Sequence, residues 1–226
     1  MERDAVDVGG QKAMRRSAGA GNGFPGLGRP VMVGRTGEPV SLVRAAGILL
    51  RWTREDVVRG FRHLYVNRLA GSHLIPRPVR FLIYRSVGAQ VGRADIFADL
   101  TITGRPQNLR IGHATGINVG CFFDCQGRVT VGERVMVGMG VTLITSDHPL
   151  GPDGRPQPAP AGRDIVIGDG VWLGARCMVL PGVTVGRGTI VSAGSVVTRD
   201  CLPDSVYAGV PARRVGPLPT GESQQG

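Results

Sequence analysis

Of the four histidines in this 226-residue chain, His148 occupies the position best suited to chemistry. It lies in the string Leu-Ile-Thr-Ser-Asp-His-Pro-Leu at residues 143–150, just before a segment at 151–163 that is rich in proline and glycine. A neutral imidazole, with an unperturbed pKa of about 6.5, can take a proton from a hydroxyl group near neutral pH. The structural alternative is a histidine that only packs against or caps a turn.

The segment around His148 interrupts a six-residue repeat that runs from Val91 to Val197. Small aliphatic residues recur at every sixth position, often followed by glycine or another small residue. The C-terminal series is unbroken and comprises Ile167, Leu173, Val179, Val185, Val191 and Val197. Upstream, the same spacing gives three triplets: Val91, Phe97 and Thr103, then Ile111, Ile117 and Phe123, then Val131, Val137 and Leu143.

A period of six fits neither an α-helix, whose faces return every 3.6 residues, nor a simple alternating strand. It is typical of short strands and turns that follow one another around a coil, with successive coils stacked to form a common core. Eight-residue steps separate the triplets, and the third step, from 143 to 167, is far longer. All three irregular steps fall at one corner of a three-sided coil. The sequence therefore predicts about five coils, beginning at 91, 111, 131, 167 and 185, with one loop that projects beside His148.

Several strings in this order resemble the maltose and galactoside O-acetyltransferase branch of the hexapeptide-repeat acyltransferases, and polysaccharide and xenobiotic acetyltransferases share much of the pattern. The strings lie at residues 143–150, 164–174, 180–186, 192–200 and 207–212. The match covers about residues 88–215. It implies an all-β left-handed parallel β-helix with a protruding loop after the third coil and a short N-terminal helical segment. The left hand comes from the resemblance and not from the spacing.

The resemblance also implies roles for three residues at the acceptor side. His148 corresponds to the catalytic base of the family. Asn118 falls on the asparagine that contacts the acceptor, although an asparagine in a turn is an equally good interpretation. Asp124 is either a turn residue or a carboxylate in the substrate cleft, and the sequence favours the turn.

For the acetyl donor, the resemblance places five residues along the groove in which family members hold coenzyme A: Trp172, Ala175, Ala193, Thr198 and Arg199. Small residues would let an extended pantetheine arm approach the wall, whereas the tryptophan could simply pack. Arg199 stands where many relatives have lysine, so charge is kept but geometry can differ. Arg213 and Arg214 could reach the coenzyme phosphates or could be solvated charges.

The function implied is transfer of an acetyl group from acetyl-CoA, as co-substrate, to a hydroxyl of a sugar, a glycan precursor or a glycosylated natural product. The resemblance further implies a homotrimer with active sites between subunits and no metal. An antibiotic acceptor is an alternative within the same class. A non-catalytic β-helix scaffold and a zinc hydratase are weaker alternatives, since such a zinc site needs three histidines and only His113 and His148 lie in the repeats.

The N-terminal part of the chain differs from the repeats in composition. Residues 1–40 are rich in glycine and predict a disordered tail. Residues 41–88 predict a basic amphipathic helical segment, 89–203 the β-helix, and 204–226 a C-terminal extension. The net charge of +10 is concentrated at 41–90, where nine arginines face two acids. Packing against the β-helix or a neighbouring subunit is one explanation of that segment; a peripheral contact with an anionic membrane surface is another. Nucleic acid is disfavoured because no recognised binding module is present.

Four cysteines, Cys121, Cys125, Cys177 and Cys201, show no metal-ligand spacing and predict buried structural thiols. No apolar run near the N-terminus approaches the length of a membrane span, and no secretory signal is visible. We therefore expect a cytoplasmic protein.

Overall fold

The computed structural model describes residues 41–157 and 161–218. The tail expected at residues 1–40 lies outside the described residues. The chain divides into two compact units, one ending at Thr53 and the other beginning at Arg54. All strands found in the described residues belong to the second unit.

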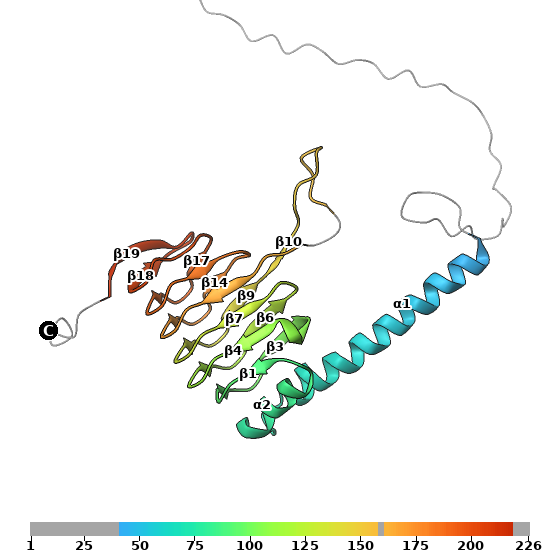
Figure 1. Ribbon diagram of the computed structural model, residues 1–226, viewed down its shortest axis with the longest axis horizontal. Coiled ribbons are helices and arrows are strands. Elements are labelled where there is room, and N and C mark those ends of the chain that lie inside the picture. Colours follow the sequence, from blue (N-terminus) through green and yellow to red (C-terminus); the bar gives the residue numbers. More distant parts are fainter. Residues whose placement is uncertain (1–40, 158–160, 219–226) are drawn as a thin grey trace, which may run out of the picture. The chain divides into compact units, whose positions relative to one another are not determined.

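The second unit is a parallel β-helix in which each coil gives one short strand to each of three sheets (Figure 1). Sheet 1 contains β1 (Gln90–Val91), β4 (Leu109–Ile111), β7 (Val129–Val131), β12 (Ile165–Ile167) and β15 (Thr184–Val185). Sheet 2 contains β2 (Asp95–Ile96), β5 (Gly116–Ile117), β8 (Met136–Val137), β13 (Trp172–Leu173), β16 (Ile190–Val191), β18 (Ser205–Ala208) and β19 (Arg213–Pro217). Sheet 3 contains β3 (Thr101–Gly104), β6 (Phe122–Cys125), β9 (Thr142–Ile144), β14 (Met178–Val179) and β17 (Val196–Val197).

The five predicted coils are thereby confirmed, and the stack continues beyond them. Strand β18 pairs in parallel with β16 and begins a sixth coil, while β19 returns antiparallel to β18.

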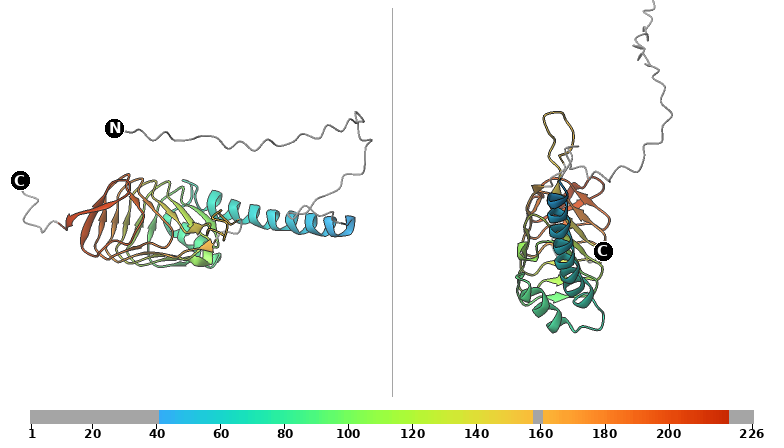
Figure 2. Two further views of the ribbon diagram at one scale, coloured as in Figure 1. Left: turned by 90° about the horizontal axis from the view of Figure 1, so that it is seen from above. Right: turned by 90° about the vertical axis from the view of Figure 1, so that its right-hand side faces the viewer.

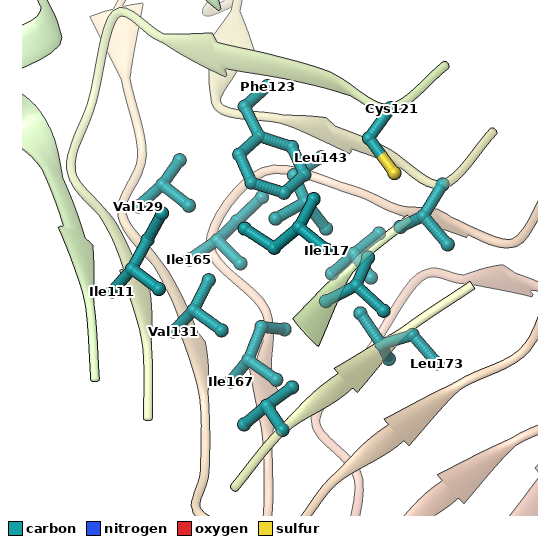
Figure 3. Packing of buried hydrophobic residues seen from close by; sticks show 14 of the residues in the cluster. Ile111, Ile117, Cys121, Phe123, Val129, Val131, Leu143, Ile165, Ile167 and Leu173 are labelled. Carbon is teal, nitrogen blue, oxygen red and sulfur yellow. The ribbon is translucent and has the colours of Figure 1, made fainter. Parts of the chain in front are cut away.

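The repeated aliphatic residues form the core. Ile111, Val131 and Ile167 stand directly above one another in sheet 1 and are almost fully buried. Figure 3 shows these side chains and those of the neighbouring sheets pointing into one interior. Burying such a side chain contributes about 1.5–3 kcal/mol, and each coil depends on its neighbours to cover it.

Close stacking explains the small residue that follows many of these aliphatics. At Gly168, an added Cβ atom would lie 2.6 Å from the backbone nitrogen of Arg187 in the next coil. No real Cβ atom fits at that distance, so the corner requires glycine.

The predicted phase of the first coil is wrong. Ile96 pairs with Ile117 and Ile102 pairs with Phe123, and both isoleucines are buried. Phe97 is 39% exposed and Thr103 is only partly buried, although the six-residue spacing places them inside. The first coil is one residue shorter between Val91 and Ile96 than the second coil is between Ile111 and Ile117. A fixed period of six cannot reveal this difference.

Helical segments precede the β-helix. They are α1 (Leu42–His63), the π-helix η1 (Leu64–Leu69) and α2 (Arg77–Ser86), with a 3₁₀ turn η2 (Pro106–Asn108) after β3. Val66 of η1 and Ala70 join the hydrophobic core, and η1 and α2 pack on the first coil. Within the described residues, no helix is both long and apolar enough to cross a membrane.

All four cysteines are buried free thiols, as expected. Burial raises their pKa values, to about 11 for Cys121 and about 12 for Cys125. They act as small core residues.

A buried arginine holds α2 to the first coil. The Arg80 side chain is 3% exposed and donates four hydrogen bonds to backbone carbonyls. The acceptors are the carbonyl oxygens of Ala70 and Ile96, each at 2.6 Å, Ser72 at 2.8 Å and Ile75 at 2.9 Å. The guanidinium thus joins the connection before α2 to strand β2.

We predict that Arg80→Met destabilises the fold by about 3–5 kcal/mol, because four carbonyls lose their donor, and lowers the melting temperature by about 10 °C. The matched control is Arg77→Met. Arg77 makes an exposed ion pair with Asp95 at 3.1 Å, and its loss should cost at most about 1 kcal/mol. Equal shifts of the two variants in calorimetry would contradict this assignment.

Candidate functional site

The loop after the third coil is a hairpin that leaves the stack at one corner (Figures 1 and 2). Its stalk pairs β10 (Ser146–Asp147) antiparallel with β11 (Ala161–Gly162), and an isolated bridge joins Leu150 to Pro156. We call this corner, where the chain passes from sheet 3 to sheet 1, the hairpin edge. The corner where the chain passes from sheet 2 to sheet 3 is the turn edge.

His148 lies on this hairpin with an exposed side chain. Its Nδ1 atom is 2.8 Å from the carbonyl oxygen of Gln157 on the opposite arm. A carbonyl can only accept, so Nδ1 carries the proton and donates, which leaves a lone pair on Nε2. The hairpin therefore holds His148 in the tautomer that a general base requires.

The base of the hairpin is tied down by Arg163. Its backbone N–H donates to the carbonyl of Thr145 at 2.9 Å, and its guanidinium lies 3.4 Å from the Asp147 carboxylate. The same guanidinium lies beside Gly182, where the positive φ of 85° and the close arginine both favour glycine. The Asp147 carboxylate in turn accepts the backbone N–H of His148 at 2.8 Å.

Asp124 is neither the turn residue that the sequence favoured nor an open cleft carboxylate. It lies within β6, is 8% exposed, and accepts hydrogen bonds from the segment that starts the hairpin. Its Oδ2 accepts the backbone N–H of Ser146 at 2.7 Å and that of Thr145 at 3.2 Å, and also the Ser146 hydroxyl at 2.5 Å. Its Oδ1 accepts the Thr103 hydroxyl at 3.1 Å. The carboxylate thus fixes the start of β10, two residues before His148.

Burial alone would raise the pKa of the Asp124 carboxyl, but hydrogen bonds from Ser146, Thr103 and Thr145 outweigh it and hold the pKa below its ordinary value of 3.8. A lowered pKa in the folded state stabilises the fold at every pH above the ordinary value. That contribution is lost as the pH falls below 3.8 and through the folded-state pKa.

Asn118 lies at the turn edge, in the turn between β5 and β6. Its side-chain oxygen accepts the backbone N–H of Val119 at 2.8 Å. The left-handed residue of this turn is Gly120, not Asn118. Among the described residues, the side-chain NH₂ of Asn118 has no hydrogen-bond partner, so it is available to a ligand.

The residues expected to bind coenzyme A divide between the two edges of sheet 3. Trp172 is 47% exposed on β13, and Ala175 and Ala193 lie in successive turns of the turn edge. Thr198 and Arg199 are exposed after β17, at the hairpin edge. Ala193 and Thr198 lie on opposite sides of β17, and five residues of chain separate them by at most about 17 Å. Arg214 lies apart from both groups, on β19, and donates to the Ser205 hydroxyl at 3.0 Å.

A single chain therefore does not bring the predicted site together. His148 and Asn118 stand at opposite edges of sheet 3, each with some of the donor residues. The sequence did not identify Gln157, Arg163 or Thr145 as supports of His148; only the Ser-Asp-His string and the arginine at the end of the loop hint at them. Within residues 41–157 and 161–218, no three histidine, cysteine or acidic side chains gather as metal ligands.

Comparison with known proteins connects this geometry to a family. A family model described as bacterial transferase hexapeptide (six repeats) matches residues 164–199. Residues 164–199 are thus similar to the repeats of that family. Galactoside O-acetyltransferase of Escherichia coli is 36% identical over 106 residues, which are 47% of this chain and 52% of that protein. The same enzyme of Lactococcus lactis is 45% identical over 80 residues, which are 35% and 38% of the two chains. The chain thus spans about half or less of the length of these curated relatives.

Solved structures resemble a larger part of the chain. A galactoside acetyltransferase in complex with coenzyme A superimposes with a TM-score of 0.64 and 28% identity, over 70% of this chain and 80% of that one. A hexapeptide-repeat acetyltransferase of Vibrio cholerae, complexed with acetyl coenzyme A, superimposes with a TM-score of 0.62 and 27% identity. The superposition covers 69% of this chain and 84% of that one. These matches bear out the stacked parallel coils of the β-helix.

We predict that Asp124→Asn loosens the hairpin, because a neutral amide oxygen accepts the Ser146 N–H and hydroxyl more weakly than a charged carboxylate oxygen does. Bonds to a charged group contribute about 1.5–3 kcal/mol, so backbone amides of residues 145–148 should exchange with solvent roughly 10- to 100-fold faster at pH 7. Thr103→Val, which removes only the bond to Oδ1, is the control and should leave the exchange of the hairpin unchanged. Unaltered exchange in Asp124→Asn would refute this role.

Proposed function

We propose that the protein is an acetyl-CoA-dependent O-acetyltransferase that acts on a hydroxyl of a sugar, a glycan precursor or a glycosylated natural product. The observation that carries the proposal is the free Nε2 of His148, held on a rigid hairpin at the edge of a β-helix similar to that of a galactoside acetyltransferase. That solved structure contains coenzyme A.

His148 supplies the proton transfer. Its Nε2 takes the proton of the acceptor hydroxyl as the hydroxyl oxygen attacks the thioester carbonyl of acetyl-CoA. As the C–S bond breaks, the protonated imidazole returns that proton to the leaving thiolate, so the ester and the free thiol form without net change at His148. The Gln157 carbonyl stabilises the imidazolium between these steps, since Nδ1 keeps its proton and donates it to this carbonyl throughout.

The donor residues fit an extended, anionic co-substrate. Ala175 and Ala193 leave the turn edge low enough for a pantetheine arm to lie against the backbone, while Trp172 offers an exposed apolar surface. Arg199 is exposed and can attract phosphate. We assign Arg214 the same task with less structural support, because its Nε is engaged with Ser205.

We further propose a homotrimer. Two edges of sheet 3 carry complementary parts of the site, and a ring of three copies would place the hairpin edge of one chain against the turn edge of the next. Asn118 would then contact the acceptor held by His148 of the neighbouring chain.

The proposal predicts that His148→Ala lowers turnover by about 10²- to 10⁴-fold while coenzyme A binding persists. The readout is thiol release from acetyl-CoA with sugar nucleotides, oligosaccharides and glycosylated antibiotics as acceptors. His113→Ala is the matched control. His113 is an exposed histidine of a regular coil, where its Nδ1 accepts the backbone N–H of Arg93 at 3.2 Å, so turnover should stay at the wild-type level. Wild-type turnover in His148→Ala would exclude His148 as the base.

The outer face of α1 and η1 suggests where the enzyme works. Within the second unit, Val57, Phe61 and Leu64 follow one another at helical spacing and are 50%, 70% and 58% exposed. Arg54, Arg62 and Arg68 flank them. We propose that this face lies on an anionic membrane surface, because it combines apolar area with positive charge that would repel a second copy of the same face.

Phe61→Ser with Leu64→Ser should abolish flotation of the protein with phosphatidylglycerol vesicles, while vesicles of phosphatidylcholine alone bind neither form. Val87→Ser, on a half-buried position away from this face, controls for general loss of apolar area. The opposite result would be that the wild type does not bind vesicles and that the double variant no longer forms the oligomer in sedimentation velocity. That result would show that the face is a subunit contact.

A further inference from the structure

A cavity lies at the hairpin edge of the first coil. It measures about 140 Å³ and opens between the end of α1 and the first coil. Its polar lining comes from Arg59, Arg62, His63, Asn67 and Thr103. A volume of this size equals that of roughly five water molecules and suits one anionic group, not a whole substrate.

The cavity is built to donate hydrogen bonds. The Asn67 amide is fixed to strand β3, since its oxygen accepts the Ile102 N–H at 2.8 Å and its nitrogen lies 3.0 Å from the Ile102 carbonyl. The same nitrogen donates to Nδ1 of His63 at 2.9 Å. Nδ1 of His63 is therefore the acceptor, and Nε2 carries the proton and can donate to a ligand.

The charge of the cavity is positive and largely unbalanced. Arg62 is partly buried and has no carboxylate within ion-pair distance among the described residues. Arg59 has one exposed partner, Asp56, at 3.3 Å. The nearest buried carboxylate, Asp124, accepts from the hydroxyl of Thr103 and uses its other oxygen on the hairpin. Two guanidinium groups in a concave site favour a phosphate oxygen cluster over a neutral sugar.

The cavity lies in line with His148 along the edge. Gly104, at its floor, pairs with Cys125 in the second coil, and Gly127 there donates to the Thr145 hydroxyl of the third coil at 2.9 Å. The first and third coils are separated by two coil spacings along the edge, which is about 10 Å. At Gly104 an added Cβ atom would lie 2.5 Å from the Cys125 carbonyl carbon, so no side chain can project from this position.

We propose that this cavity binds a phosphate group of the acceptor, and that the enzyme acetylates phosphate-bearing glycan precursors whose hydroxyl reaches His148. The inference rests on the proposed function, of which it names the substrate class. The phosphate could belong to a soluble sugar nucleotide or to a lipid-linked sugar diphosphate, which present the same chemistry to Arg59, Arg62 and His63.

The test combines binding and kinetics. Inorganic pyrophosphate should bind the wild-type protein in calorimetry and compete with the acceptor. Arg62→Gln should weaken pyrophosphate binding and raise KM for a sugar nucleotide about 10- to 100-fold, with little change in kcat or in KM for acetyl-CoA. Arg134→Gln, at an exposed arginine of the β-helix that pairs with Glu133 at 3.4 Å, is the control and should leave both pyrophosphate binding and KM unchanged. In parallel, kcat/KM is measured with a lipid-linked sugar diphosphate in vesicles and compared with kcat/KM for the soluble sugar nucleotide. The larger value identifies the source of the phosphate.

The result that would overturn the proposal is absence of pyrophosphate binding, or an equal rise in KM for neutral and phosphorylated acceptors in Arg62→Gln. Failure of the proposed function is distinguishable from this. If His148→Ala kept full turnover, pyrophosphate binding and its loss in Arg62→Gln would still report on the cavity.

Discussion

Stacking of the coils in strict register is the constraint on which the rest of the structure depends. Successive coils exchange backbone hydrogen bonds, such as Gly112 N–H to Val131 at 2.8 Å and Gly132 N–H to Ile167 at 2.9 Å. Each coil must therefore return directly above the one before it. An insertion can leave only at a corner. After the hairpin, β12 resumes pairing with β7, with Ile165 opposite Val129, as though the hairpin were absent.

That constraint also decides where chemistry can occur. The flat strands are committed to ladder bonds and core packing, so ligand-binding side chains collect at the corners. At the hairpin edge, Asp124 and Arg163 bind the base of the insertion that carries His148. At the turn edge, close stacking requires glycine at positions such as Gly138 and Gly174. One chain holds the two halves of the proposed site on opposite sides of sheet 3, so the proposed function requires assembly of more than one copy.

The six-residue spacing predicts the coils, most core positions and the corner from which the loop projects, because period and burial are local properties of a stacked strand. It misplaces Phe97 and Thr103, since the shortened first coil is set by packing against η1 and α2. It misassigns Asp124 as a turn residue, because the contacts of its carboxylate with Thr145 and Ser146 join segments that are far apart in the sequence. The cavity around Arg62 was equally invisible, as it depends on Asn67 reaching across to Ile102.

The central claim is that the reacting site combines His148 of one chain with Asn118 of its neighbour. Subunit complementation tests it directly. His148→Ala and Asn118→Ala proteins, each nearly inactive, are unfolded, mixed in equal amounts and refolded, and acetyl transfer is measured. Random trimers should recover about a quarter of wild-type activity, since that fraction of interfaces joins an intact histidine to an intact asparagine. Activity no greater than that of the separate variants would contradict the claim.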